Sequence, residues 1–307
     1  MFKQSFTNLS KLPKQRVRQW LSTFETIICD ADGVLWHFNK AIEGAPETFN
    51  LLKASGRRMF VVTNNSGVES SALIKKARSF GIELDDNHML TSAMAIAHYL
   101  GSKKFSKKAY IIGEPGINHE LSKFDICSFA VQNEQSDKSM LQFAKEMKLD
   151  PEVGAVIVAK DDTFNVQTIM RACAYLLNNR VLFLGTCLDG AYPIGNNRVL
   201  VGAGAMIAAI KTISGRKPLI LGKPNPMMVN ELRNCGHINP ETTLMIGDTL
   251  KTDILFAHNS GFQSLFVGTG VSTVKDVEAA RCSGTQQGMA MVPDTYLPSL
   301  VQLQEFV

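Results

Sequence analysis

The fold is decided by the stretch Thr26–Gly33, which reads TIICDADG. Its first four residues form a short apolar run, and a run of this kind beside polar residues predicts a buried strand. Asp30 and Asp32 follow at once, so both stand just beyond the end of that strand. In a parallel sheet, side chains at this position converge on one crevice at the carboxyl ends of the strands. The stretch therefore predicts an α/β protein with a polar site at a strand end.

Three more apolar runs in the chain are followed by polar residues in the same way. The runs are Met59–Val61, Pro218–Leu221 and Thr243–Ile246, and they precede Val62–Asn65, Gly222–Pro224 and Gly247–Asp253. If all four strands share one sheet, carboxylates, a hydroxyl, backbone amides and an ammonium group meet in a small volume. This set of groups fits an anionic substrate with a divalent cation better than it fits a packed core.

Strand and helix patterns alternate along the chain, which predicts a doubly wound parallel sheet. The second and third polar segments are too far apart for a single crossover, and the residues between them alternate on their own. The strands expected there are Ala109–Ile112, Ala155–Val158 and Val181–Leu184, and the helices are Leu141–Met147 and Val166–Leu177. We therefore expect a core domain made of residues 1–100 and 205–307, with a second α/β domain, residues 101–204, inserted into it.

The composition is that of an ordinary soluble globular protein: 307 residues, 45% of them hydrophobic and 20% charged. The net charge of +4 is too small to indicate nucleic-acid binding. No apolar stretch approaches the roughly 20 residues that span a bilayer, so we expect no membrane partner. The six cysteines form no C-x-x-C pair, which argues against a zinc site and a disulfide framework. We expect a cytoplasmic protein with reduced thiols.

The N-terminal segment is basic and contains no acidic residue before Glu25. Such a start is also found in mitochondrial transit peptides, which is the minor alternative. The main expectation is a surface helix, because Val17, Trp20, Leu21 and Phe24 follow one another at helical spacing and lead into the first strand.

Asp30 and Asp32 have the chemistry that phosphoryl transfer needs. One carboxylate can attack phosphorus, and the other can protonate the departing oxygen and later take a proton from water. Gly33 allows the backbone to leave the strand sharply. A surface turn is the alternative interpretation of D-x-D-G, and the buried strand before it makes that alternative weaker.

Asp248 and Asp253 add negative charge to the same predicted crevice. Carboxylates so close together raise one another's pKa unless a cation is present, and magnesium binds carboxylates, phosphate oxygens and water. Helix capping is the alternative role for both residues. Thr63 and the amides after it would bind phosphate oxygens, and Lys223 would offset phosphoryl charge. A lysine at a strand end is otherwise simply solvated.

Together the four segments resemble the signature motifs of the haloacid dehalogenase superfamily, in their expected order. DADGVLW at residues 30–36, VTNNS at 62–66 and GKPNP at 222–226 are similar to its 4-nitrophenylphosphatase branch. That branch includes phosphoglycolate and pyridoxal phosphate phosphatases. The resemblance covers the chain from about Leu21 onward. It implies a Rossmannoid core of the HAD-like type with an inserted α/β cap of the type called C2.

The resemblance also implies roles for particular residues. Asp30 would be the nucleophile and Asp32 the general acid and base. Magnesium would be held by the Asp30 carboxylate, the Asp32 backbone carbonyl and the Asp248 carboxylate, with Asp253 in support. The residues expected to bind phosphate or substrate are Thr63, Asn64, Asn65, Lys223 and, on a cap loop thought to face the active site, Tyr192. A turn is the alternative role for that loop.

The expected function is that of a magnesium-dependent phosphatase for small phosphomonoesters, phosphoglycolate-like ones first, with 4-nitrophenyl phosphate as an assay substrate. Pyridoxal phosphate or a phosphorylated protein is the alternative substrate. A phosphotransferase or a non-catalytic protein that binds a phosphorylated ligand is the alternative class. Three departures from the branch bear on substrate choice: Phe38 where relatives often have glycine, Thr249 where they often have arginine, and Thr186-Cys187-Leu188-Asp189 where many have Thr-Asn-x-Asp. Relatives dimerise through the cap, so a homodimer is expected.

Overall fold

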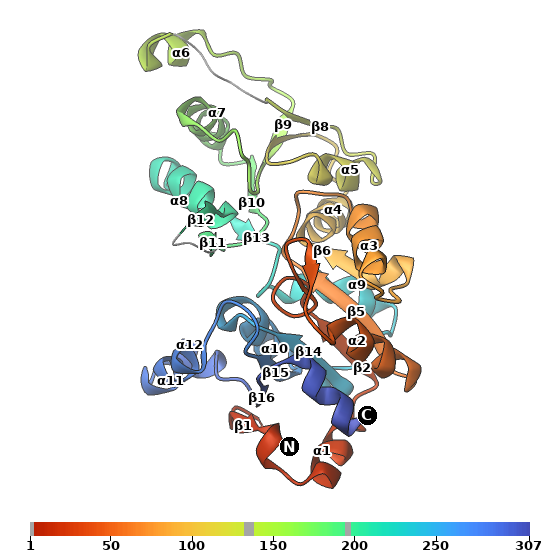
Figure 1. Cartoon of the computed structure of the whole chain (residues 1–307). Coiled ribbons are helices and arrows are strands. Elements are labelled where there is room, and N and C mark those ends of the chain that lie inside the picture. The colour runs from red at the N-terminus through yellow and green to blue at the C-terminus, as the bar shows by residue number, and fades with distance from the viewer. Residues whose placement is uncertain (1–2, 132–137, 194–197) are drawn as a thin grey trace. The chain divides into compact units, whose positions relative to one another are not determined.

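A computed structural model describes residues 3–131, 138–193 and 198–307 (Figure 1). The chain forms two compact units. The first unit comprises the N-terminal residues up to Thr63, Ser71–Leu90 and Lys223–Val307. The second unit comprises Asn64–Ser70 and Thr91–Gly222. The chain therefore leaves the first unit and returns to it twice.

The first unit is built on a seven-stranded sheet with the order β1-β16-β15-β14-β2-β5-β6. The strands are β1 (Thr7–Asn8), β16 (Thr295–Leu297), β15 (Gln263–Val267), β14 (Thr243–Gly247), β2 (Thr26–Cys29), β5 (Arg58–Thr63) and β6 (Met89–Thr91). The pairings from β1 through to β5 are parallel. Cys29 at the end of β2 lies opposite Ile246 and Val61, so the residues that follow these three strands emerge at one edge.

Helices and short turns complete the first unit. The α-helices are α1 (Lys14–Leu21), α2 (Ala45–Ala54), α3 (Ser70–Ser79), α9 (Asn230–Asn234), α10 (Leu255–Ser260), α11 (Val274–Cys282) and α12 (Gln286–Ala290). The 3-10 helices are η1 (Leu9–Lys11), η2 (Asp86–His88), η3 (Pro226–Val229), η4 (Pro240–Thr242) and η6 (Leu300–Phe306), a π-helix η5 spans Leu250–Ile254, and a hairpin pairs β3 (Trp36–His37) with β4 (Lys40–Ala41).

The core of the first unit is built around β2 and β14, which are buried along their whole length. Val17, Trp20 and Leu21 of α1 join this core, as their helical spacing predicts, and Phe24 is buried just beyond the helix. Burial of side chains of this size contributes about 1.5–3 kcal/mol each. Cys29 is fully buried in this core.

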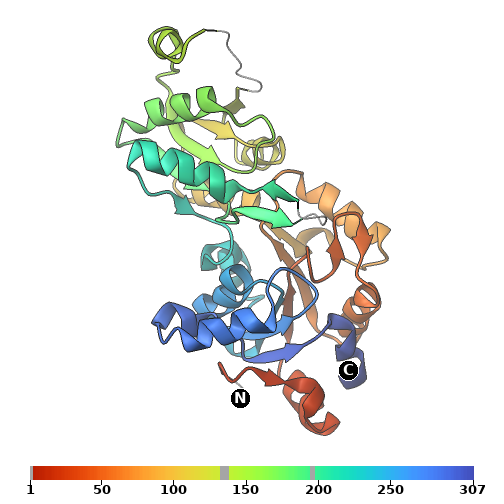
Figure 2. The same ribbon diagram turned by 60° about the vertical axis from the view of Figure 1, so that its left-hand side comes forward.

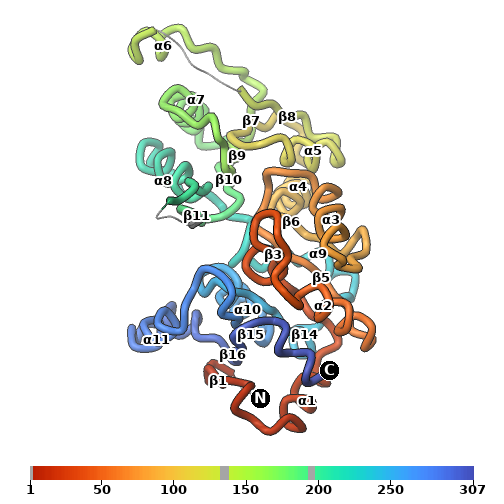
Figure 3. The backbone as a smooth tube through the Cα atoms, in the orientation of Figure 1, coloured from red at the N-terminus to blue at the C-terminus, as the bar shows by residue number. Residues whose placement is uncertain are grey.

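The two ends of the chain both belong to the first unit, as the tube in Figure 3 makes plain. Strand β1 adds a seventh, parallel strand by pairing Thr7 with Thr295. Helix η6 packs against α1 and α2. The sequence does not predict β1, because two polar residues carry no strand pattern.

The second unit has a five-stranded parallel sheet with the order β13-β10-β9-β7-β8. Its strands are β13 (Leu219–Ile220), β10 (Leu182–Gly185), β9 (Val153–Val158), β7 (Lys108–Ile112) and β8 (Ser128–Ala130), with an antiparallel hairpin of β11 (Ala191–Pro193) and β12 (Val199–Val201). Its helices are α4 (Ser92–Ser102), α5 (Gly116–Ser122), α6 (Met140–Glu146), α7 (Val166–Leu176) and α8 (Ala203–Ser214). Helices α7 and α8 lie side by side (Figure 2).

One predicted strand lies in a different sheet from the one expected. The run before Lys223 was expected to join the strands that end at Asp30 and Thr63. Instead β13 pairs with β10, at the edge of the second unit's sheet. The strand with which β13 pairs depends on the path of the chain through the second unit. A short apolar run carries no information about that path.

The predicted domain boundaries at 100/101 and 204/205 stay a prediction. The compact units themselves change at 63/64, 70/71, 90/91 and 222/223. Within the second unit, α4 packs on α5 and α8 packs on α7. The predicted α/β fold class itself is confirmed. Among the described residues, no helix combines the length and apolar character that a bilayer crossing requires.

Candidate active site

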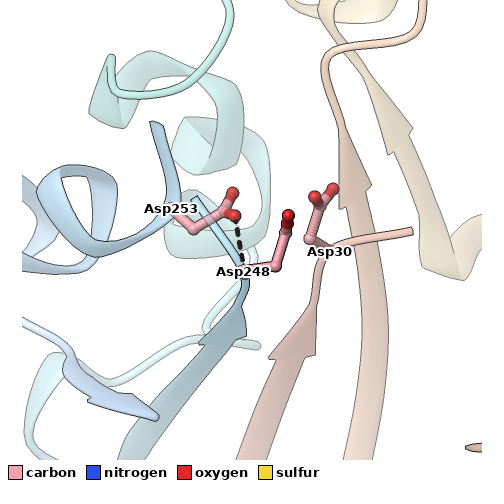
Figure 4. Close-up of side chains that lie close together, drawn as sticks. All are labelled: Asp30, Asp248 and Asp253. Carbon is pink, nitrogen blue, oxygen red and sulfur yellow. Dashed lines mark hydrogen bonds between the residues drawn. The ribbon is translucent and has the colours of Figure 1, made fainter. Parts of the chain in front are cut away.

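Asp30 and Asp248 stand at the ends of neighbouring parallel strands, β2 and β14 (Figure 4). Their carboxylates, together with that of Asp253, each place an oxygen within 4.8 Å of the other two. All three residues are buried in the first unit. The backbone N–H of Asp30 donates to the carbonyl of Ile246 at 2.9 Å, which continues the ladder between the two strands. The carboxyl ends of β2 and β14, where the sequence predicts the site, thus carry a cluster of buried carboxylates.

Lys223 brings the only cation that the described residues place in contact with this acidic group. Its Nζ donates to Oδ1 of Asp30 at 2.6 Å and lies 2.8 Å from Oδ1 of Asp253. A third bond, 2.8 Å long, runs to the carbonyl of Val62 at the end of β5. Lys223 as a whole residue is 1% exposed. Although β13 belongs to the other sheet, Lys223 itself therefore lies among the strand ends of the first unit.

Asp253 reaches the cluster because η5 is a π-helix. Within this wider turn, the N–H groups of Asp253 and Ile254 both donate to the carbonyl of Thr249, at 2.9 and 3.3 Å. Oδ2 of Asp253 then accepts the backbone N–H groups of Asp248 and Thr249, each at 3.1 Å. One oxygen of Asp253 thus fixes the backbone beside Asp248, while the other pairs with Lys223. Asp253 therefore holds both Lys223 and the backbone at Asp248 in place.

Two glycines surround the carboxylate of Asp248. At Gly33, where φ is +87°, a β-carbon would lie 2.7 Å from Oδ2 of Asp248; at Gly270 it would lie 1.8 Å from the same atom. The next N–H, that of Val271, donates to Oδ2 at 2.6 Å. The sequence suggests only a turn at Gly268-x-Gly270. The close approach to Asp248 has no local sequence signal, because the two segments meet only through the fold.

Burial and mutual repulsion shift the titration of this cluster. Burial, and then the charge of Asp253, raise the pKa of Asp30 well above its usual range, although Lys223 opposes them. The same two causes raise the pKa of Asp248 to about 7, with the Val271 N–H acting against them. Burial alone would lower the pKa of Lys223, but the charges of Asp253 and Asp30 outweigh it and the pKa is raised. The lysine therefore stays charged.

Asp32 and Thr63 border the cluster from the first unit. The side chain of Asp32 is exposed, yet protein surrounds its carboxyl closely enough that desolvation raises its pKa, against the charge of Lys76. Thr63 is buried at the last position of β5, one residue after the carbonyl that Lys223 binds. Thr269 holds the turn after Asp32 by donating from its hydroxyl to the Gly33 carbonyl at 2.6 Å.

The remaining predicted site residues, Asn64, Asn65 and Tyr192, belong to the second unit. Nδ2 of Asn64 donates to Asp189 at 3.2 Å. Asn65 is exposed, and its Oδ1 accepts the N–H of Gly67 at 3.1 Å in a local turn. Tyr192 lies in β11, where its hydroxyl is 3.8 Å from Sγ of Cys187. The structure thus brings together Asp30, Lys223, Asp248 and Asp253 in the first unit, whereas Asn64, Asn65 and Tyr192 belong to the second.

The acidic cluster fits a divalent cation. Oδ1 of Asp248 is buried and has no hydrogen-bond partner among the residues that the structure describes. Both oxygens of Asp253 are engaged by Lys223 and backbone amides, so Asp30 and Asp248 are the carboxylates that face a shared space. Magnesium is a hard cation that prefers one or two carboxylates with water and phosphate oxygens.

A parallel α/β core whose strand ends carry buried carboxylates and a lysine defines a class of hydrolytic enzymes. Two family models match the chain. The model described as haloacid dehalogenase-like hydrolase matches residues 27–127, and the model described as HAD-hydrolase-like matches residues 220–300. The chain belongs to the haloacid dehalogenase-like hydrolases, as its motifs predict.

Individual relatives agree with this family. Human glycerol-3-phosphate phosphatase is 32% identical over 301 residues, which cover 95% of this chain and 94% of that protein. Phosphoglycolate phosphatase 1A from Arabidopsis thaliana is 34% identical over 264 residues, covering 85% of this chain and 73% of that protein. The structure of 4-nitrophenylphosphatase from Thermotoga maritima matches with a TM-score of 0.74 at 26% identity, covering 92% of this chain and 97% of that one. These relatives are phosphatases by name, in line with the predicted class.

Proposed function

We propose that this chain is a magnesium-dependent phosphatase that hydrolyses small phosphate monoesters through a phosphoaspartate on Asp30. The observation that carries the proposal is the joint position of Asp30, Lys223 and Asp248 at the strand ends of one unit. Family membership supports it, because the relatives named above act on phosphate esters.

In the proposed first step, Asp30 attacks phosphorus. Lys223 binds Oδ1 of Asp30, so the attacking oxygen is Oδ2. A bond forms between Oδ2 and phosphorus, and the bond from phosphorus to the alcohol oxygen breaks. Asp32 gives its proton to that oxygen, and its raised pKa favours the protonated form that this step needs. The alcohol then leaves.

In the proposed second step, a water oxygen bonds to phosphorus while Asp32 takes a proton from that water. The bond between Oδ2 of Asp30 and phosphorus breaks, which restores the Asp30 carboxylate and releases phosphate. Asp30, Asp248 and the backbone carbonyl of Asp32 would hold magnesium, which when bound offsets the negative charge of the phosphoryl oxygens. Lys223 adds a fixed positive charge beside the phosphoryl group. The hydroxyl of Thr63 and the backbone N–H groups of the residues after it would bind phosphoryl oxygens. Asp253 keeps Lys223 and Asp248 in place.

The substrates we propose are phosphate esters of small alcohols, with phosphoglycolate and glycerol 3-phosphate first. Two relatives that cover most of this chain carry the names of these activities. Pyridoxal phosphate comes next. A panel of phosphorylated metabolites, assayed with and without magnesium, ranks these candidates by kcat/KM.

The test of the proposed mechanism is the Asp30→Asn variant. Asparagine keeps the size of the side chain and removes the nucleophilic carboxylate, so hydrolysis of 4-nitrophenyl phosphate is expected to be lost. A variant that hydrolyses this substrate near the wild-type rate would refute the role of Asp30. A wild-type protein that releases no phosphate from any ester in the panel would favour a non-catalytic protein that binds phosphorylated ligands.

A further inference from the structure

A hydrogen bond within the second unit links two segments that are 125 positions apart in the chain. Nδ2 of Asn64 donates to Oδ2 of Asp189 at 3.2 Å. Asn64 is the first residue after β5, and Asp189 lies in the loop between β10 and β11. Both side chains are partly buried. A bond to a carboxylate is stronger than one between neutral groups, and partial burial protects it from solvent.

Backbone hydrogen bonds hold the loop that carries Asp189. The backbone N–H of Gly204 donates to the carbonyl of Asp189 at 2.9 Å, and that of Gly202 donates to the carbonyl of Gly190 at the same distance. A β-carbon at Gly202 would lie 2.1 Å from the Asp189 carbonyl oxygen, so the two segments are in direct contact. The backbone at Asp189 and Gly190 is thus fixed to residues 202–204.

Asn64 is also held by its other neighbours in the second unit. Ser92 donates from its hydroxyl to the Asn64 carbonyl at 2.8 Å. A β-carbon at Gly222 would lie 2.6 Å from Oδ1 of Asn64, so the side-chain oxygen rests on that glycine. Gly222 in turn donates its N–H to the carbonyl of Thr186 at 2.8 Å. The segment Thr186–Asp189 therefore fixes Asn64 and Gly222 together.

These two residues are the immediate chain neighbours of predicted phosphate-binding groups. Asn64 follows Thr63, and Gly222 precedes Lys223. A shift of either residue moves its neighbour through the shared peptide bond. Misplacement of a substrate-binding group by about 1 Å can cost a hundredfold in rate. The support that Asp189 gives to Asn64 thus bears on turnover.

We propose that Asp189 is a positioning residue of the phosphatase, acting through Asn64 to hold the backbone beside Thr63 in its productive place. The proposal rests on the proposed function. Because Asp189 acts on the phosphate side of the reaction, its effect is the same for every ester, whatever the alcohol. This distinguishes it from Tyr192, whose predicted contact with the leaving group makes its effect depend on the substrate.

The first test compares two substitutions at residue 189. Asp189→Ala removes the acceptor and is expected to lower kcat by about tenfold for both 4-nitrophenyl phosphate and glycerol 3-phosphate. Asp189→Asn keeps an oxygen that accepts the same bond and is expected to stay within about twofold of wild type. Asp162→Ala removes an exposed carboxylate elsewhere in the second unit and is the matched control. Melting temperatures show whether each variant is folded.

The second test is a double-mutant cycle with Asn64→Ala. If Asp189 acts through Asn64, Asp189→Ala changes kcat by less than about twofold once Asn64 is already alanine. Additive losses, a wild-type kcat in Asp189→Ala, or a loss for one ester alone would overturn the proposal. An equal loss in Asp189→Asn would overturn it as well. A wild-type protein without any turnover would overturn the proposed function and this role with it, whereas the other outcomes leave the proposed function intact.

Discussion

Lys223 is the residue whose removal disturbs the site most. Its ammonium group is buried between Asp30 and Asp253, at 2.6 and 2.8 Å. The Lys223→Met variant leaves two buried carboxylates without their cation, which is expected to cost about 3–5 kcal/mol of unfolding free energy. Urea unfolding in magnesium-free buffer measures this loss. Lys14→Met, at an exposed ion pair, is the control and is expected to change little. A Lys223→Met protein as stable as wild type would contradict this account of the charges.

Phe38 offers the opposite case, a residue whose replacement is expected to stabilise the protein. It stands at the turn between β3 and β4 with φ at +46°, and it is 53% exposed. This left-handed conformation strains an L-residue by roughly 1–2 kcal/mol but is open to glycine. Phe38→Gly is therefore expected to gain up to about 1 kcal/mol, since the extra backbone freedom of unfolded glycine takes back part of the relief. A thermal or urea midpoint that falls would contradict this.

At the scale of elements, the parts of the site that follow buried strands were predictable from the sequence. The apolar runs before Asp30, Thr63 and Asp248 form β2, β5 and β14, and parallel pairing aligns their ends. The π-helix η5 was not predictable: it spans Leu250–Ile254 and runs directly into the α-helix α10, which begins at Leu255. A segment of five residues is too short for a single wider turn to show in the spacing of its apolar residues. That turn nevertheless places Asp253 beside Asp30 and Asp248.

The loop after β15 supplies the next prediction. A β-carbon at Gly270 would lie 1.8 Å from Oδ2 of Asp248. Gly270→Ala is therefore expected to push Asp248 away from the Val271 N–H and to lower kcat/KM by at least about tenfold, with a higher magnesium requirement. Titration of activity with magnesium measures both effects. Wild-type magnesium dependence in this variant would show that the position of Asp248 is not constrained by Gly270.

At the scale of the whole molecule, the site is assembled from distant parts of one chain. Asp30 and Lys223 are 193 positions apart, and the second unit lies between them in the sequence. The order of the motifs and the presence of an inserted α/β region were predictable from alternating patterns. The sheet that β13 joins was not, and neither were the points at which the units change, because both depend on long-range packing.

The stability of the protein is expected to depend on pH and magnesium together. Burial raises the pKa of Asp248 to about 7, whereas an unfolded aspartate titrates at about 4. Between these values the folded state binds more protons, so without magnesium its stability falls as the pH rises. Magnesium binds the ionised carboxylates, and its stabilising effect therefore grows over the same range. Melting temperatures at pH 5 and pH 8, with and without magnesium, check this; an equal magnesium effect at both pH values would contradict it.

The most direct measurement of the central claim is the identity of the residue that carries the phosphoryl group during turnover. The protein is mixed with substrate and magnesium, quenched in acid within the first turnovers, digested and examined by mass spectrometry. We predict a hydroxylamine-sensitive phosphoryl group on Asp30, absent from Asp30→Asn. A phosphoryl group on another residue, or rapid phosphate release with no modified Asp30 at any quench time, would contradict the account.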